Sequence, residues 1–211
     1  MPIVISLGGS FLFEKRNEID NLFDLINHIK DKFLIVVGGG VLAREYINFA
    51  KQFKIEEENL HYIGILSTRI NARIISMAYN VKYSEEDPRK LKLHEKVKVM
   101  GGYLPGWTTD VCAAYAAKSL KSKIIVNLSK EKGVYDKDPN KFKDAKLLKL
   151  ISFSALIKLV NEKRYPGANY IFDPLAAEIC RKNNISVIVT NDVEDIRKYV
   201  DGKKVNGTII I

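Results

Sequence analysis

The sequence is poor in the residues that build metal sites and disulfide frameworks. Its 211 residues include only two cysteines and three histidines. Cys112 and Cys180 lie far apart in apolar, helix-like segments, which predicts buried free thiols. His28, His61 and His94 are scattered along the chain, without a serine–histidine–acid or cysteine–histidine arrangement. We therefore expect no metal site built from side chains and no catalysis by an activated serine or cysteine.

Long hydrophobic runs are also missing. No apolar stretch approaches the roughly 20 residues that a membrane-spanning helix needs. The first residues, "MPIVISLGGS", lack the basic region and the small-residue cleavage site of a secretory signal. With so little cysteine, these features predict a cytoplasmic protein without a membrane partner.

The charge balance is basic, with 34 lysine and arginine residues against 25 acids and a net charge of +9. This balance favours anionic partners. The lysines are scattered and are not interleaved with aromatic residues, so we expect no nucleic-acid binding. An anionic small substrate such as a nucleotide fits the charge, and so does a lysine-rich solvated surface of a heat-adapted protein.

Short apolar runs alternate with amphipathic segments along the chain. The runs predict strands at 3–7, 33–37, 96–100, 123–129, 185–190 and 208–211. Helices are predicted at 17–32, 41–53, 57–79, 109–120, 151–162, 173–183 and 193–200. This alternation is typical of an α/β fold with a mostly parallel sheet covered by helices on both faces. We expect one domain over residues 1–211, with the polar stretch 130–145 as an excursion or lid.

Three glycine clusters each follow a predicted strand: Gly8-Gly9, Gly38-Gly39-Gly40 and Gly101-Gly102. In open parallel sheets, ligands bind at the carboxyl ends of the strands, where glycine permits close backbone approach. A helix that begins after such a turn directs N–H groups at an anion. Arg44 would stand in the first helical turn after the second cluster and could reach a phosphate. Neither a P-loop nor a G-x-G-x-x-G fingerprint is present.

Six motifs occur in a fixed order over nearly the whole chain. They are "ISLGGS", "VVGGGVLAREY", "IGILSTRINA", "VMGGYLPGWTTD", "GVYDKDP" and "DPLAA". Together they resemble the amino acid kinase superfamily and, within it, the archaeal-type UMP kinases. The resemblance implies a three-layer α/β/α sandwich that transfers the γ-phosphoryl group of ATP to UMP with Mg²⁺. It also implies a homo-oligomer, usually a hexamer built as a trimer of dimers.

The resemblance implies a role for matched positions in two parts of the chain, an acceptor part in 1–122 and an ATP part in 123–211. Gly9, Ser10 and Arg44 would form the catalytic centre. The ATP contacts would be Gly8, Gly9, Ser10, Gly40, Arg44, Ser129, Lys130, Tyr135 and Asp138. The UMP contacts would be Gly39, His61, Tyr103, Leu104, Pro105, Gly106, Trp107, Thr108 and Thr109.

Four positions depart from the family pattern. Ser6 stands where many members have a lysine, and His61 stands where an aspartate usually holds the ribose hydroxyls. Lys130 and Lys132 replace an asparagine and an aspartate of the "T-N-x-D-G-V-Y" motif. Lys132 is therefore a candidate catalytic group that would supply the positive charge missing at Ser6. The alternative is that its side chain points to solvent.

Two further functional hypotheses stay open on these departures. His61 is compatible with a related kinase that phosphorylates another small phosphate or carboxylate. The two lysines are compatible with a nucleotide-binding sensor that has no catalytic activity.

Overall fold

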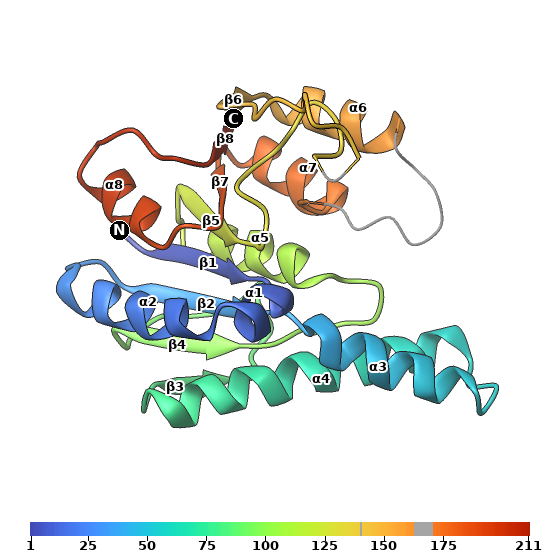
Figure 1. The fold of residues 1–211 in the computed structure, drawn as a ribbon. Helices are drawn as coiled ribbons and strands as arrows, with labels where there is room; N and C mark the ends of the chain where they lie inside the picture. Colours follow the sequence, from blue (N-terminus) through green and yellow to red (C-terminus); the bar gives the residue numbers. More distant parts are fainter. Residues whose placement is uncertain (140, 163–170) are drawn as a thin grey trace.

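A computed structural model describes residues 1–139, 141–162 and 171–211, arranged around one eight-stranded sheet (Figure 1). The strands are β1 (Ile3–Leu7), β2 (Phe33–Val37), β3 (Lys82–Ser84), β4 (Val97–Met100), β5 (Ile124–Leu128), β6 (Leu150–Ile151), β7 (Ser186–Thr190) and β8 (Thr208–Ile210). Their order is β3-β4-β2-β1-β5-β7-β8-β6. All neighbours are parallel except β7 and β8, so β8 and its partner β6 run against the rest.

Helices cover both faces of the sheet. They are α1 (Gly9–Glu14), α2 (Arg16–His28), α3 (Gly40–Lys51), α4 (Glu57–Ala78), α5 (Thr109–Ser119), α6 (Phe153–Glu162), α7 (Pro174–Lys182) and α8 (Glu194–Val200). Helices α5, α6 and α7 form one core with the sheet, and α1, α2, α4 and α8 form the other. The three-layer α/β/α prediction is therefore confirmed, whereas α3 packs mainly on α4 (Figure 1).

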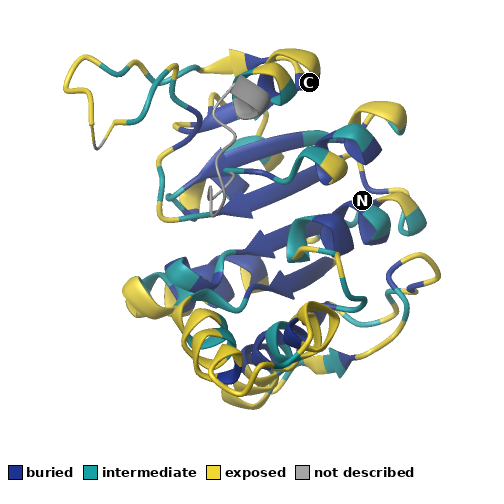
Figure 2. Cartoon of the chain, turned by 90° about the vertical axis from the view of Figure 1, so that its right-hand side faces the viewer, coloured by how far each residue is buried: buried dark blue, intermediate teal, exposed yellow. Residues whose placement is uncertain are grey.

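Alternate residues of the central strands supply the two cores. In β2, Leu34 and Val36 join one apolar cluster, whereas Ile35 and Val37 join the other. Every residue of β1, β2 and β5 is buried, and the exposed residues lie on the helices, the loops and the outer strands β3 and β6 (Figure 2). Burial on both faces explains why these strands appear as continuous apolar runs and not as alternating patterns.

The sequence-based elements agree with the structure to within two residues at each end, apart from three short elements and one boundary. The short elements β3, β6 and α1 were not predicted, because three, two and six residues are too few for a periodic pattern. The helix predicted at 17–32 ends at His28, since Ile29 is already extended. Within the described residues, no helix combines the length and the apolar character needed to cross a bilayer.

Candidate functional site

The first two glycine turns are packed directly against each other beyond the ends of β1 and β2. A Cβ atom on Gly9 would lie 2.1 Å from the backbone nitrogen of Gly40. One on Gly40 would lie 2.4 Å from the carbonyl carbon of Gly9. Gly40 also has a φ of +59°, which side chains other than glycine rarely adopt. Both positions therefore require glycine, and the two turns form one rigid backbone surface.

Arg44 lies at this surface, at the start of the second turn of α3, because the helix begins at Gly40 and not at Val41. Its Nη2 atom lies 3.5 Å from Oγ of Ser10, which belongs to the first glycine turn. The Arg44 side chain is otherwise exposed. An arginine, a hydroxyl and the N-terminal N–H groups of α3 are thus gathered at one edge of the sheet, which suits an anion such as a phosphoryl group.

Buried polar residues of α4 support the second and third glycine turns. Thr68 Oγ1 accepts a 2.6 Å hydrogen bond from the backbone N–H of Gly102. Asn71 donates from Nδ2 to the carbonyl oxygen of Gly38 at 2.8 Å. Neither residue was predicted as part of the site, although their polarity on an otherwise apolar helix face was a usable signal. Helix α4 thereby fixes the turns that the resemblance assigns to the acceptor.

Arg69 and Arg73 lie on the same helix but are already paired. Arg69 donates from Nε to the carbonyl oxygen of Gly102 at 3.2 Å, and its Nη1 lies 3.5 Å from Glu85. Arg73 lies 3.6 Å from the same carboxylate and 3.9 Å above the ring of Tyr83. We therefore infer that Arg69 supports the third glycine turn and that both arginines hold the segment around Glu85, which follows β3.

The predicted acceptor loop, Tyr103–Thr109, is anchored by its tryptophan. Trp107 stacks on Tyr115 of α5 with ring centroids 4.6 Å apart, and the Arg89 guanidinium lies 5.4 Å from the indole centroid. Gly106 adopts a φ of +77° with open space around it, which lets the loop turn. Tyr103, Leu104 and Pro105 are half-buried. The indole therefore packs the loop onto α5 and is not a freely exposed ring.

Thr108 caps the helix that follows this loop. Its Oγ1 accepts from the backbone N–H of Val111 at 3.3 Å and donates to Asp173 Oδ2 at 2.9 Å. Asp173 in turn caps α7. Thr109 is the first residue of α5 and is half-buried. The loop is thus tied to the start of a second helix, from the other part of the chain.

Asp110 joins the same two helices to the end of β1. Its Oδ1 accepts a 2.7 Å hydrogen bond from the Ser6 hydroxyl, and its Oδ2 accepts one of 3.2 Å from the backbone N–H of Asp173. Burial raises the pKa of Asp110 to about 6, although both hydrogen bonds act in the opposite direction. Ser6, at the position where the family often has a lysine, thus donates to a carboxylate that has no cation beside it among these contacts.

Replacing Asp110 with asparagine should remove a pH dependence of stability. An asparagine can accept from Asp173 and donate to Ser6, so the geometry is kept. Because the pKa of Asp110 is raised in the folded state, the protonated carboxyl stabilises the fold. This contribution to the free energy of unfolding is fully present below about pH 4 and is lost as the pH rises through about 6. The variant should gain about 1 to 3 kcal/mol over wild type between pH 4 and pH 8, measured by urea unfolding. If the free energies of unfolding of the two proteins changed with pH in the same way, Asp110 would not be the group responsible.

The predicted ATP residues lie in the loop after β5. Gly8 approaches this loop, since a Cβ on it would lie 3.0 Å from the carbonyl oxygen of Leu128 and 3.7 Å from Cα of Ser129. Ser129 therefore lies beside the first glycine turn. Lys130 and Lys132 are exposed at the start of the excursion.

Two other ATP candidates lie further along the excursion. Tyr135 and Asp138 are half-buried, and Tyr135 forms a single antiparallel bridge with Leu147. The excursion predicted for 130–145 extends to the start of β6, and residue 140 lies outside the described part.

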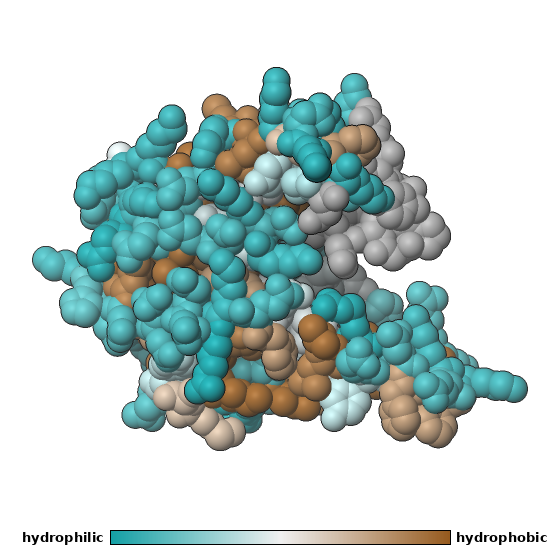
Figure 3. All heavy atoms as spheres, viewed as in Figure 1, coloured by the Kyte–Doolittle hydropathy of each residue, from teal (hydrophilic) through white to brown (hydrophobic). Residues whose placement is uncertain are grey.

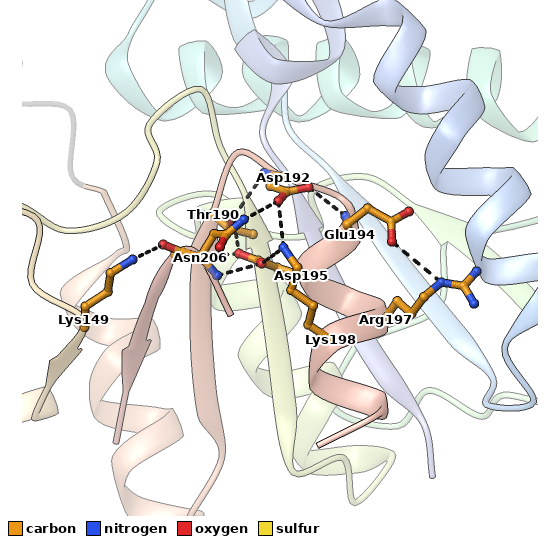
Figure 4. Close-up of polar contacts among 9 residues, drawn as sticks. Lys149, Thr190, Asp192, Glu194, Asp195, Arg197, Lys198 and Asn206 are labelled. Carbon is orange, nitrogen blue, oxygen red and sulfur yellow. Dashed lines mark hydrogen bonds and ion pairs between the residues drawn. The ribbon is translucent and has the colours of Figure 1, made fainter. Parts of the chain in front are cut away.

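A cluster of polar side chains connects β7, α8 and the start of β8 beside the loop that follows β5. Figure 4 shows Thr190, Asp192, Asp195, Lys198 and Asn206 pointing toward one another at the end of β7. Asp195 is fully buried and accepts from the Thr190 hydroxyl at 2.7 Å and from Lys198 Nζ at 3.1 Å. No motif marks this cluster in the sequence, because its members are ordinary polar residues at turns.

His61 lies apart from the interlocked turns, exposed on α4 one turn before Ile65. A Cβ on Gly102 would lie 3.5 Å from the Ile65 side chain. Residues four apart share a helix face, so His61 belongs to the side of α4 that faces the third glycine turn. This position is compatible with an acceptor role, which stays a prediction.

The described residues contain no group of three or more His, Cys, Asp or Glu side chains that could hold a metal ion. A groove of about 440 Å³ does occur, but between α2 and α8 and away from the glycine turns. Its lining includes Glu18, Asp24, His28 and Arg197. We assign the site to the glycine edge because the backbone donors and Arg44 converge there.

Comparison with known proteins gives full-length matches. A model of the amino acid kinase family matches residues 1–191. The uridylate kinase of Methanocaldococcus jannaschii is 36% identical over 224 residues, covering 100% of this chain and 99% of that protein. The crystal structure of the Archaeoglobus fulgidus uridylate kinase is similar with a TM-score of 0.83 and 34% identity, over 100% of both chains. The UMP kinase of Ureaplasma parvum, 24% identical with a TM-score of 0.73 over 100% of this chain and 98% of that one, shares the fold.

Proposed function

Because the chain belongs to the amino acid kinase family, we propose that it transfers the γ-phosphoryl group of ATP to UMP. A phosphate oxygen of UMP attacks the γ-phosphorus, the bond to the bridging oxygen breaks, and ADP leaves with UDP as product. The observation that carries this proposal is the pair of interlocked glycine turns with Arg44 beside them. Full-length identity of 36% to a uridylate kinase supports UMP as the acceptor.

Positioning and charge stabilisation are what this reaction needs from a protein. In our proposal, Gly8, Gly9 and Ser10 line the transfer centre, where backbone N–H groups meet the moving phosphoryl group. Gly40 and Arg44 hold the phosphates of ATP. No side-chain nucleophile is needed, because the acceptor phosphate itself supplies the attacking oxygen.

The two nucleotides would lie on opposite sides of this centre. Gly39, His61 and the loop Tyr103–Thr109 would hold UMP, supported by α4 and by the Trp107 stack. Ser129, Lys130, Tyr135 and Asp138 would hold ATP. Lys132 is exposed near the start of the same loop, and in our proposal its ammonium group stabilises negative charge on the phosphates.

Magnesium would enter with ATP. Mg²⁺ keeps several waters and prefers phosphate oxygens, so it does not need a cage of protein carboxylates. When bound, it neutralises charge on the β- and γ-phosphates. We place the reaction in the cytoplasm, where both nucleotides are available.

An ADP-release assay with UMP, CMP, dUMP and AMP as acceptors tests this function. We expect turnover with UMP above the other three. Absence of turnover with every nucleotide, in protein shown to be folded by circular dichroism, would sink the proposal. The same assay is repeated with small phosphates and carboxylates, and a preference for one of them would favour the alternative acceptor that the exposed His61 suggests. ATP binding in calorimetry without any turnover would favour a sensor.

We also propose that the protein is a homo-oligomer, by expectation a hexamer built as a trimer of dimers. Large exposed apolar residues follow one stripe of α4 and continue on α3. They are Tyr62, Leu66, Ile70, Ile74 and Met77 on α4, Tyr46 and Phe49 on α3, and Phe53 in the turn just after α3. Figure 3 shows apolar surface over α4 along the lower edge of the molecule. Contiguous patches of this kind are rare on monomers, so a second copy of the chain is the proposed cover.

Replacing Ile70 with lysine should therefore reduce the assembly size. Its side chain is 48% exposed in the middle of the stripe, so the change introduces a charge at the contact without disturbing the core. Light scattering coupled to gel filtration should give wild type near six times 23.9 kDa and the variant a smaller multiple. Val200→Lys, at a 39% exposed position on α8, is the matched control and should keep the wild-type mass. A monomeric wild-type protein would refute the oligomer.

A further inference from the structure

The last described strand lies directly under the loop to which we assign ATP. Thr208, the first residue of β8, is fully buried. Its Oγ1 accepts a 2.8 Å hydrogen bond from the backbone N–H of Val134 and donates one of 2.6 Å to the carbonyl oxygen of Leu148. Val134 and Leu148 lie near the two ends of the excursion, so one hydroxyl holds both ends.

The loop can approach this hydroxyl only because it carries a glycine. A Cβ on Gly133 would lie 2.4 Å from Thr208 Oγ1. Val134 is also buried, and its carbonyl oxygen accepts from the N–H of Leu148 at 2.8 Å. The contact is thus a close-fitting one in which a small displacement of Thr208 must move the loop.

Asp195 holds the two residues that precede Thr208 in the chain. Its carboxylate accepts from the backbone N–H groups of Asn206 and Gly207 at 2.7 and 2.9 Å, immediately before β8. It also accepts from Thr190, the last residue of β7 (Figure 4). Thr190 in turn accepts from the Ser129 N–H at 3.0 Å through its carbonyl oxygen. The chain of contacts therefore begins and ends at the loop 129–135.

We infer that Thr208, held by Asp195, is the positioning residue that sets the loop 129–135 for ATP. The inference rests on the proposed function, which assigns Ser129, Lys130 and Tyr135 to ATP. Thr208 touches neither nucleotide and acts through the backbone of Gly133 and Val134. Its loss should weaken ATP binding and leave the acceptor side unchanged, since the acceptor turns are supported from α4.

Thr208→Val tests this inference, because it keeps the shape and removes the hydroxyl. The N–H of Val134 loses its partner, and we expect the KM for ATP to rise about tenfold with less than a twofold change in the KM for UMP. Thr208→Ser restores the hydroxyl and should return the KM for ATP to within about threefold of wild type. If the valine variant does not fold, Thr208→Ala lets water reach both partners and should show the same ATP-specific effect.

Ser122→Ala is the matched control. Ser122 also has a buried hydroxyl, whose Oγ lies 2.8 and 2.9 Å from the carbonyl oxygens of Pro2 and Ile124, but it lies just before β5, at the end of the central strands opposite to the glycine turns. This variant should lower the melting temperature without changing either KM. Equal shifts of both KM values in Thr208→Val, or an unchanged KM for ATP, would overturn the inference.

A calorimetric arm separates this inference from the proposed function. ATP is titrated into wild type and Thr208→Val without any acceptor, and the Kd for ATP should be about tenfold weaker in the variant. If wild type binds ATP but phosphorylates no UMP, the proposed function fails while this arm still decides the role of Thr208. Equal Kd values for the two proteins would refute the positioning role.

Discussion

Arg44→Ala is expected to lower kcat by roughly a hundred- to a thousandfold, because it removes the guanidinium group at the transfer centre. The Arg44 side chain is exposed, and its one hydrogen bond among the described residues is to Ser10, so its loss should leave the melting temperature nearly unchanged. Arg44→Lys keeps the charge without the fork of donors and should recover only part of the rate. Steady-state kinetics with ATP and UMP measure both effects.

The control for this experiment is Arg197→Ala. Arg197 is partly exposed and pairs with Glu194 on α8, away from the glycine turns. It should retain wild-type kinetics. An Arg44→Ala enzyme with undiminished kcat would remove Arg44 from the catalytic centre, whatever the acceptor is.

Gly9→Ala is expected to abolish measurable activity, with a loss of at least about a hundredfold in kcat/KM. Its new methyl group would lie 2.1 Å from the Gly40 nitrogen, so the two turns must separate. Because backbone and not a flexible side chain is in the way, the clash cannot be relieved locally. We also expect a loss of about 2 kcal/mol in the free energy of unfolding, measured with urea.

Gly64→Ala provides the contrast for Gly9. A Cβ on Gly64 would meet only the end of the Ile47 side chain, at 3.4 Å. Since Gly64 lies inside α4, alanine should raise stability by up to about 1 kcal/mol. Equal activity losses in both variants would mean that the interlock of the two turns is not what activity requires.

The glycine edge could be predicted from sequence because each part of its signal is local. Gly8-Gly9, Gly38-Gly39-Gly40 and Gly101-Gly102 each follow a short buried run, and parallel strands end at a common edge. Arg44 follows from its spacing after Gly40. What could not be predicted is that Gly9 and Gly40 touch, because this depends on β1 and β2 being neighbours in the sheet.

The residues that support the glycine turns and the ATP loop could not be predicted for the same reason. Thr208 lies 74 residues from Val134, and neither position carries a motif. Thr68 and Asn71 are visible as polar residues, but only the packing of α4 shows which turns they support.

Apolar periodicity has a related limit, which α3 illustrates. The spacing of Tyr46, Phe49 and Phe53 correctly predicts a helix with one apolar face. It does not indicate what covers that face. In the structure all three side chains are largely exposed, whereas Ala50 on the same helix is buried. Period alone cannot distinguish a face packed on the chain's own core from one kept for another molecule.

The Trp107 stack gives the protein a built-in optical reporter. Trp107 is the only tryptophan in the chain, and its indole lies against Tyr115 in the loop assigned to the acceptor. Fluorescence excited where only tryptophan absorbs therefore comes from this one loop. Any ligand that reorders the loop changes the surroundings of the indole, so its emission would follow acceptor binding in real time without a label.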